Sequence, residues 1–341
     1  GHGVTGELLD MTAIKGISLY EPGALTIVAK AGTPLAEIEA ELAKEKQRLA
    51  FEPMDHRPLY ATKGKPTIGG VVAGNVSGPR RIQAGACRDS LIGVRFVDGE
   101  GTIVKNGGRV MKNVTGYDLV KLMCGSLGTL GVLTEVGFKV LPMPEACASV
   151  IIPGLDNASA IKAMSAALTS PYDVNGAAHV PGKGTFVRIE GFEGSVKYRS
   201  GELKELLGRF GEVVVEADQK ASQSLWAGIR DVEHLASGEG DIWRISVKPS
   251  EGAKIVDLLG EGAQAQFDWG GGLVWARVPA GSDVRKRLNG FEGHATLMRA
   301  DETTRKKLGV FQPEQPALAA ISAGLRAKFD PMGVLNPGRM G

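Results

Sequence analysis

The chain has 341 residues, of which 43% are hydrophobic and 23% are charged. This length allows two domains, because a single hydrophobic core stops growing at about 250–300 residues. The 40 Lys and Arg residues nearly balance the 38 Asp and Glu residues, and aromatic residues make up only 6%. These values exclude a nucleic-acid-binding protein, which needs a basic surface or a stacking platform.

The first clear elements are a strand and a helix. Residues 25–30 form an apolar run that predicts a strand, and apolar residues at helical spacing predict a helix over 35–42. Thr33 is expected to cap this helix, and Pro34 to lie in its first turn, where no N–H group is needed. The order is therefore strand, turn and amphipathic helix.

Residues 51–90 are rich in Pro and Gly and are predicted to be irregular. Strands are predicted at 93–97 and 101–104, with the turn signal Asp-Gly-Glu-Gly between them. A further strand is predicted at 131–141. It ends in Pro142-Met143-Pro144, which we interpret as the domain boundary.

Beyond this boundary, helical and strand patterns alternate. Helices are predicted at 157–169, 200–210, 222–235 and 316–329, and strands at 185–192, 212–217, 242–248 and 272–278. The pattern indicates an α+β protein whose second domain has a mostly antiparallel sheet. We predict a first domain at 1–143, a second domain at 144–315, and a segment at 316–341 that returns to the first domain.

Residues 67–81 (TIGGVVAGNVSGPRR) place glycines and small residues around Val71 and Val72, a spacing unlike that of a stable helix. Glycines let backbone N–H groups approach a ligand because no Cβ is in the way, so this segment suits a diphosphate. Asn75, Ser77 and the pair Arg80-Arg81 are candidate side-chain donors. A glycine-rich hairpin packed in a core is an equally good interpretation of this segment alone.

A second segment, residues 113–135, favours the interpretation that these glycines face a ligand over that of a packed hairpin. It surrounds a short predicted helix, from Tyr117 to about Cys124, with small and polar residues, namely Asn113, Thr115, Gly116, Asp118, Gly125, Ser126, Gly128 and Gly131. Removing side chains in this way fits a flat ring system or a second phosphate face. The tail at 329–340 holds Asn336 and Arg339 between prolines and glycines, and we expect it to be docked.

Together these segments resemble the PCMH-type FAD-binding fold of the vanillyl-alcohol-oxidase and UDP-acetylmuramate-reductase type. Within it, the chain resembles the family of E subunits of bacterial glycolate oxidases. The stretches that carry the likeness are GTPLAEIEAEL (32–42), TIGGVVAGNVSGPRR (67–81), RDSLIG (88–93), VMKNVTGYDLVKLMCGS (110–126), GTLGVLTE (128–135), VLPMP (140–144), EGFEGSV (190–196), LWAGIR (225–230), IWRISV (242–247), FDWGG (267–271), GHAT (293–296) and FDPMGVLNPGRM (329–340). The likeness therefore covers nearly the whole chain.

The resemblance implies FAD as cofactor, held at Thr67, Ile68, Gly69, Gly70, Asn75, Ser77, Gly78, Arg80, Asp89, Gly116, Asp118, Gly125, Gly131, Val132, Asn336 and Arg339. It implies an FAD-dependent 2-hydroxy-acid oxidoreductase that oxidises glycolate to glyoxylate as part of a complex. Its expected partners are a second flavin subunit of the D type and an iron–sulfur subunit of the F type. We expect a cytoplasmic protein, attached through its complex to the inner face of the membrane.

The start of the chain departs from the family pattern. The family has a further leading helix and strand that end in an early pyrophosphate loop, so we expect the FAD-binding domain here to lack its first subdomain. Residues 1–6 fit G-x-G-x-x-G. We do not interpret them as a dinucleotide fingerprint, because no strand precedes them and no amphipathic helix follows.

Oxidation of a 2-hydroxy acid needs a base for the hydroxyl proton and a cation for the carboxylate. His294 and His56 are the candidate bases, because the pKa of histidine lies near neutrality. Each is also readily explained as a structural or surface histidine. Arg244 alternates with apolar neighbours in IWRISV, so it either faces a cleft as the cation or forms a cross-strand ion pair.

No cluster of Cys, His or Asp has metal-ligand spacing, and the histidine-rich metal motif of related hydroxy-acid dehydrogenases is absent, so we predict no metal site. The cysteines Cys87, Cys124 and Cys147 fit neither a disulfide framework nor a paired redox motif, which agrees with a reducing cytosol. Two alternatives stay open. One is a non-catalytic structural or electron-transfer subunit of the same complex, and the other is a stand-alone flavin oxidoreductase for another hydroxy acid.

Overall fold

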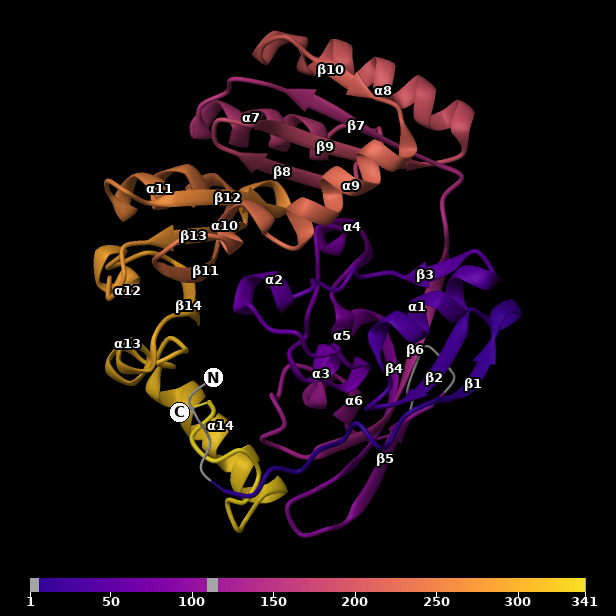
Figure 1. Ribbon diagram of the computed structural model, residues 1–341, viewed down its shortest axis with the longest axis vertical. Coiled ribbons are helices and arrows are strands. Elements are labelled where there is room, and N and C mark those ends of the chain that lie inside the picture. Colours follow the sequence, from indigo (N-terminus) through magenta and orange to yellow (C-terminus); the bar gives the residue numbers. More distant parts are fainter. Residues whose placement is uncertain (1–5, 109–115, 341) are drawn as a thin grey trace.

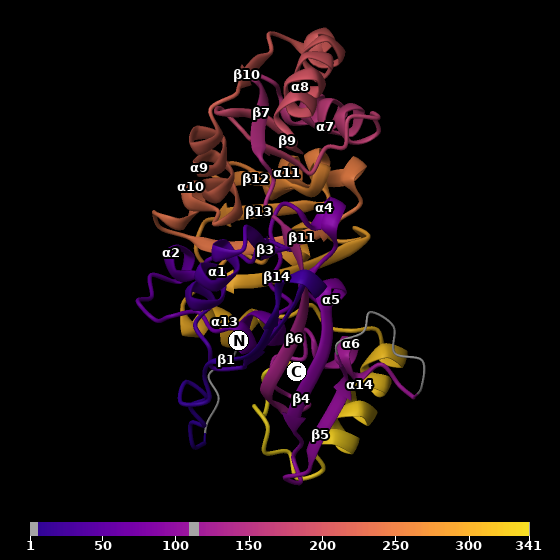
Figure 2. The ribbon, with the colours of Figure 1, turned by 90° about the vertical axis from the view of Figure 1, so that its right-hand side faces the viewer.

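The computed structural model describes residues 6–108 and 116–340. Within these ranges the strands form two antiparallel sheets, one built before residue 143 and the other after residue 145. The second sheet and its helices lie above and to the left of the first sheet in Figure 1, and Figure 2 shows the same arrangement from the side. The predicted contacts of Asn113 and Thr115, and most of the glycine pattern at 1–6, lie outside the described residues.

The first sheet has six strands in the described ranges, in the order β1-β2-β6-β4-β5, with β3 paired to β6. They are β1 (Ile17–Glu21), β2 (Thr26–Lys30), β3 (Gln47–Leu49), β4 (Leu91–Val97), β5 (Ile103–Gly107) and β6 (Val132–Pro142). In β6, Val136, Phe138 and Val140 are buried, as expected where alternate side chains of a strand face a core. The predicted strands at 25–30, 93–97, 101–104 and 131–141 are all present.

Helix α1 (Leu35–Lys44) buries Leu35, Ile38 and Leu42 against this sheet, as their spacing predicts. The predicted cap was wrong. Pro34 is the N-cap residue, and Thr33 instead donates a hydrogen bond to Lys30 O and accepts one from Gly16 N–H. Thr33 is buried, so its hydroxyl satisfies nearby backbone groups rather than the helix end.

The prediction that residues 51–90 are irregular was also wrong, since short helices recur there. The helices are α2 (Arg57–Tyr60), α3 (Ile68–Ala73), α4 (Arg81–Ala84) and α5 (Cys87–Ser90), followed by α6 (Leu119–Met123). Helix α3 forms despite its two glycines because Ile68, Val71 and Val72 are buried in the core of the first sheet. Tertiary packing therefore overrides the low helix propensity of this segment.

The second sheet has eight strands in the described ranges, in the order β10-β7-β9-β8-β12-β13-β11-β14. They are β7 (Ala146–Ile152), β8 (Gly176–Val180), β9 (Gly184–Gly191), β10 (Val214–Glu216), β11 (Asp241–Val247), β12 (Gln264–Asp268), β13 (Leu273–Val278) and β14 (Gly293–Arg299). The associated helices are α7 (Asn157–Leu168), α8 (Glu193–Leu207), α9 (Gln219–Arg230), α10 (Glu233–Ala236), α11 (Gly252–Leu259), α12 (Val284–Arg287) and α13 (Glu302–Leu308). The protein is α+β, as predicted.

Helix α14 (Pro316–Phe329) matches the predicted range of 316–329. The chain then reaches back to the first sheet, where Phe329 packs against Phe96 with ring centroids 6.1 Å apart and accepts a hydrogen bond from Gly99 N–H. The first sheet ends at Pro142 and the second begins at Ala146. The division into domains at these points stays a prediction. None of the helices in the described ranges has the length and apolar character needed to cross a bilayer.

Candidate functional site

A cavity of about 820 Å³ lies where α3, the loop after α6 and the C-terminal tail meet. Its wall is rich in small and apolar residues, namely Gly6, Glu7, Leu8, Leu9, Asp10, Met11, Thr12, Ala31, Thr67, Gly69, Gly70, Ala73, Leu127, Gly128, Gly131, Val132, Leu133, Val334, Leu335, Asn336, Pro337 and Arg339. This volume is within the range of about 300–1,000 Å³ that is typical of small-molecule and cofactor sites. The two glycine-rich segments and the tail, far apart in sequence, therefore share one cavity.

In α3, packing explains the two glycines, whereas the sequence predicted that they approach a diphosphate. Gly69 N–H donates to Ala31 O at 2.8 Å, and Gly70 N–H is directed at the Thr67 hydroxyl at 3.3 Å. A Cβ on Gly69 would lie 2.7 Å from the Cβ of Ala31. The glycine pair thus lets the helix pack closely on the end of β2, and these N–H groups already have protein acceptors.

The loop after α6 is also shaped by packing. A Cβ on Gly131 would lie 2.6 Å from the ring of Phe96, so no larger residue fits without movement. Gly128 has a φ of +72° and lies against Asn336, whose amide donates to Leu127 O at 3.0 Å and to Gly128 O at 3.3 Å. Asn336 therefore fastens the tail to this loop and closes one side of the cavity.

Arg339 supplies positive charge to the cavity wall. Its Nε atom is buried and has no hydrogen-bond partner among the described residues. Its charge also reaches Tyr60, whose pKa is raised by burial and partly lowered again by Arg339 and Arg305. An unpartnered buried donor of this kind is costly without an acceptor, so an anionic ligand would satisfy it.

The remaining predicted contacts in the first half lie away from the cavity and bond locally. Asn75 accepts Arg88 N–H, Ser77 accepts Cys87 N–H, Asp89 accepts Ala86 N–H and Asp118 caps α6 through Lys121 N–H. Ile68 is fully buried, and Gly116 and Gly125 have φ of +79° and +89°. Their described contacts are those of caps, turns and core, and their assignment to a cofactor stays a prediction.

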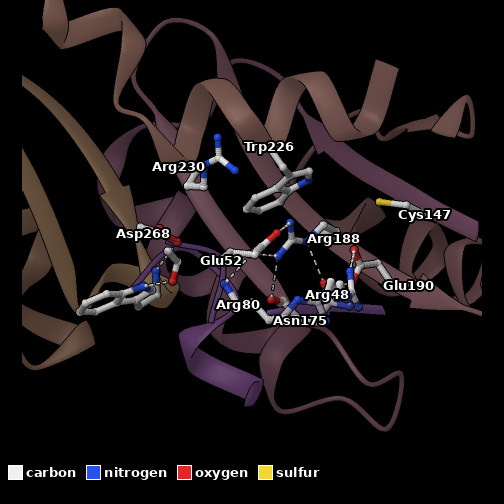
Figure 3. A network of polar contacts seen from close by, with 12 residues as sticks. Arg48, Glu52, Arg80, Cys147, Asn175, Arg188, Glu190, Trp226, Arg230 and Asp268 are labelled. Atoms are coloured by element: carbon white, nitrogen blue, oxygen red, sulfur yellow. Dashed lines mark hydrogen bonds and ion pairs between the residues drawn. The ribbon is translucent and has the colours of Figure 1, made fainter. Parts of the chain in front are cut away.

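Gly78 and Arg80 contact the second half of the protein instead. Gly78 O accepts the Trp269 indole N–H at 3.1 Å, and the buried Arg80 guanidinium pairs with Glu190 of β9. Glu190 also receives two hydrogen bonds from Arg48 of β3, at 3.0 and 3.1 Å (Figure 3). Arg80, at the start of α4, is therefore paired with a residue of the second sheet, which differs from its predicted position against a cofactor phosphate.

Glu52 and Arg188 complete this network, and the sequence analysis missed both. Arg188 of β9 donates to Glu52 at 2.8 and 2.7 Å and to Asn175 Oδ1 at 2.9 Å (Figure 3). Burial opposes ionisation of Glu52, but the charge and hydrogen bonds of Arg188, together with the charges of Arg80 and Arg48, outweigh it and lower the pKa of Glu52 to about 2. No local pattern signals this pair, because its members are 136 residues apart.

The predicted catalytic residues gather on one face of the second sheet. Ser246 of β11 pairs with His294 of β14, and Arg244 pairs with Thr296, so the side chains of Arg244 and His294 project from the same face on neighbouring strands. Desolvation, followed by the charges of Arg244 and Arg81, lowers the pKa of His294. His294 is consequently neutral at neutral pH and able to accept a proton.

His56 approaches the same face from the first half. Desolvation lowers its pKa, the carboxylates of Asp231 and Asp55 raise it, and the charge of Arg244 lowers it again. Its ring stacks on Tyr60, with centroids 5.7 Å apart and planes 13° apart. Burial thus acts on both rings, since it lowers the pKa of His56 and raises that of Tyr60.

Trp269 and Arg81 also lie beside Arg244, and the predicted catalytic residues included neither of them. The guanidinium carbon of Arg81 lies 4.4 Å from the Trp269 ring centroid, and that of Arg244 lies 5.2 Å from it. Burial lowers the pKa of Arg244 to about 10, which leaves it charged at neutral pH. The pair Arg80-Arg81 was recognised in the sequence, but only the structure shows that Arg80 is buried in the network and Arg81 faces Trp269.

Comparison with known proteins shows where this architecture occurs. A family model described as an FAD binding domain matches residues 1–107. The chain is 38% identical over 342 residues to the glycolate oxidase subunit GlcE of Escherichia coli K12, covering all of this chain and 89% of that protein. It is 46% identical over 79 residues to the glycolate oxidase subunit GlcD of Bacillus subtilis 168, covering 23% of this chain and 17% of that protein.

A solved structure of alkyldihydroxyacetonephosphate synthase superposes with a TM-score of 0.68 at 15% identity, covering 97% of this chain and 68% of that one. This likeness shows the fold.

The cavity suits FAD: its volume fits a cofactor, its glycine-rich wall admits close approach, and Arg339 offers an unpartnered donor to a phosphate. The predicted residues that line this wall and would hold FAD are Thr67, Gly69, Gly70, Gly131, Val132, Asn336 and Arg339. The chain therefore belongs to the GlcE family of FAD-binding oxidoreductase subunits.

Proposed function

We propose that this chain is the FAD-binding subunit of a complex that oxidises glycolate to glyoxylate. The observation that carries the proposal is the 38% identity to E. coli GlcE along the entire chain. The site supports it, because the protein combines a cavity that suits FAD with a cluster of one partly buried arginine and two histidines of lowered pKa. Oxidation of a small 2-hydroxy acid needs a cation for the carboxylate and a base for the hydroxyl proton.

FAD, when bound, supplies the acceptor for two electrons. The chain's own residues bind and orient the substrate. Arg244 is charged at neutral pH and binds the carboxylate, while the neutral His294 on the adjacent strand accepts the hydroxyl proton. Proton transfer to a positioned base contributes typically 10²- to 10⁴-fold to the rate. His56, on the facing segment, is the second candidate for this base.

We also propose the assembly. The partners are a second flavin subunit of the D type and an iron–sulfur subunit of the F type, through which electrons leave. The support is that the names of the relatives in E. coli and B. subtilis describe both GlcE and GlcD as glycolate oxidase subunits. We place the complex in the cytoplasm, peripherally at the inner face of the membrane, on the family resemblance.

The test is co-purification of the chain with its D-type and F-type partners. We expect a yellow complex whose flavin absorbance bleaches on anaerobic addition of glycolate and returns with an artificial electron acceptor. A chain that is colourless and unaffected by added FAD would contradict the proposal. Assaying the chain alone then separates two roles, since turnover without partners would refute a purely structural or electron-transfer subunit.

A further inference from the structure

Trp269 lies at the contact between the two halves of the protein, and its ring forms a cation–π contact with one arginine from each half. Resting on the proposed function, we infer that Trp269 is a positioning residue that holds Arg81 and Arg244 as a two-armed site for the substrate carboxylate. Arg81 begins α4 in the first half, and Arg244 lies on β11 in the second. The site is therefore complete only where the two halves meet.

The two arginines are free to bind an anion. Both lie within about 6 Å of the same indole centroid, the range of a cation–π contact. Neither forms an ion pair with a carboxylate or donates a side-chain hydrogen bond within the described part of the chain. Two unpaired guanidinium groups repel each other, and the charge of Arg81 contributes to the lowered pKa of Arg244. A bound anion would relieve this repulsion.

Trp269 is held rigidly enough to act as a support. Its backbone N–H donates to Asp268 Oδ1 at 2.7 Å, and its indole N–H donates to Gly78 O at 3.1 Å across the two halves. Its φ of +54° is unfavourable for a non-glycine residue, so surrounding contacts must fix this conformation. A Cβ on Gly78 would overlap the carbonyl oxygen of Glu52, which explains the glycine at this close approach.

The chemistry favours a carboxylate as the anion. A guanidinium offers a planar fork of N–H donors that matches a carboxylate in two parallel hydrogen bonds. Among the described residues, Asp268 raises the pKa of Arg244 and Asp89 that of Arg81, but neither carboxylate forms an ion pair with these arginines, and Asp268 is only 3% exposed. His294 lies on the strand next to Arg244, so a carboxylate held by the arginines places an adjacent hydroxyl group on the side of a base.

The test titrates the purified full chain with oxalate, a dicarboxylate that the proposed reaction does not oxidise, and follows binding by calorimetry and tryptophan fluorescence. Ethylene glycol, which is uncharged, and phosphate are the comparison probes. We expect oxalate to bind more tightly than phosphate and ethylene glycol not to bind. Trp269→Leu, Arg81→Gln and Arg244→Gln should each weaken oxalate binding about tenfold. Trp269→Phe keeps a ring face and should weaken it by less than threefold.

Trp226 offers a matched control, because its ring faces Arg188 at 4.7 Å in the buried network. Trp226→Phe should leave oxalate binding unchanged. In the double variant Arg81→Gln/Trp269→Leu, the Trp269 change should cost less than it does alone, because it acts through Arg81. In the complex, Trp269→Leu should raise KM for glycolate about tenfold with kcat within about threefold.

Equal costs of Trp269→Leu with and without Arg81 would overturn the inference, as would wild-type oxalate affinity in Arg81→Gln. The oxalate affinity of Arg81→Gln tests the inference even if Trp269→Leu does not fold. Failure of this inference and failure of the proposed function give different results. If glycolate is not oxidised but oxalate binding depends on Trp269 as described, the anion site stands and only the assigned reaction fails.

Discussion

The Arg188 guanidinium on β9 donates two hydrogen bonds to the Glu52 carboxylate, at 2.8 and 2.7 Å, and so joins the second sheet to the segment after β3. Both groups lie in a network with Arg48, Arg80 and Glu190 (Figure 3). Removing ions from water offsets much of their attraction, so such a pair adds little net stability. Its geometric effect is to fix how the two halves meet, which is where Arg81 and Arg244 approach Trp269.

Breaking this pair should be costly even though forming it gains little. Arg188→Met keeps the length of the side chain but leaves Glu52 without its main partner, and we expect a loss of about 3–5 kcal/mol in the free energy of unfolding. Urea unfolding measures it. The matched control is Lys44→Met, which breaks the exposed pair with Glu41 and should cost less than about 1 kcal/mol. Similar losses in the two variants would contradict the assignment.

The same carboxylate predicts an acid-sensitive contribution to stability. The pKa of Glu52 is about 2, against an ordinary value of 4.5. A carboxyl with a depressed pKa stabilises the folded state above its unfolded pKa, and this contribution is lost as pH falls through the folded value. We expect the wild type to lose more stability than Glu52→Gln between pH of about 5 and 2. Parallel stability curves over this window would show that Glu52 contributes no linkage.

Gly131 should tolerate no side chain. In Gly131→Ala the new Cβ would lie 2.6 Å from the Phe96 ring and 2.9 Å from Met123 Cε. We expect a loss of about 1–3 kcal/mol, the usual cost of overpacking a core. Gly201 in α8 is exposed with open space around it, so Gly201→Ala should stabilise the protein by about 0.5–1 kcal/mol. A neutral Gly131→Ala in thermal unfolding would show that the loop shifts readily.

Arg339 should matter for cofactor binding and little for folding. Arg339→Gln removes the positive charge from the cavity wall, and we expect FAD affinity to fall about tenfold because a charge-assisted hydrogen bond is worth roughly 1.5–3 kcal/mol. Titration of FAD into stripped protein, followed by flavin fluorescence, measures the change. Lys328→Gln, an exposed change on α14, is the control and should bind FAD normally. Equal affinity in both would remove Arg339 from the site.

The pH profile of turnover should identify the base. The pKa of His294 is lowered from 6.5, so kcat/KM of the complex with glycolate should rise with pH, and the midpoint of this rise should lie below pH 6.5. His294→Gln should reduce kcat about 10²- to 10⁴-fold and remove this limb of the profile. If His56→Gln removes the limb instead, His56 is the base and His294 only binds.

Several parts of the fold follow from local sequence alone. The strand near 25–30, the helix α1, the long strand β6 and the helix α14 were each predicted within a few residues. In α1 and β6 the apolar side chains recur at the period of a helix or a strand, and burial of that face is what stabilises the element. Glycine-rich composition also marked the two segments that line the cavity.

Only the tertiary structure decided the roles of individual side chains in these segments. Gly69 and Gly70 looked like donors to a phosphate, yet Ala31 and Thr67 accept their hydrogen bonds. Neighbouring Arg80 and Arg81 have opposite roles, since one is buried against Glu190 and the other faces Trp269. Local pattern cannot separate such residues, because their partners lie on β9 and beyond β12. Which group meets which is set by how the two sheets pack.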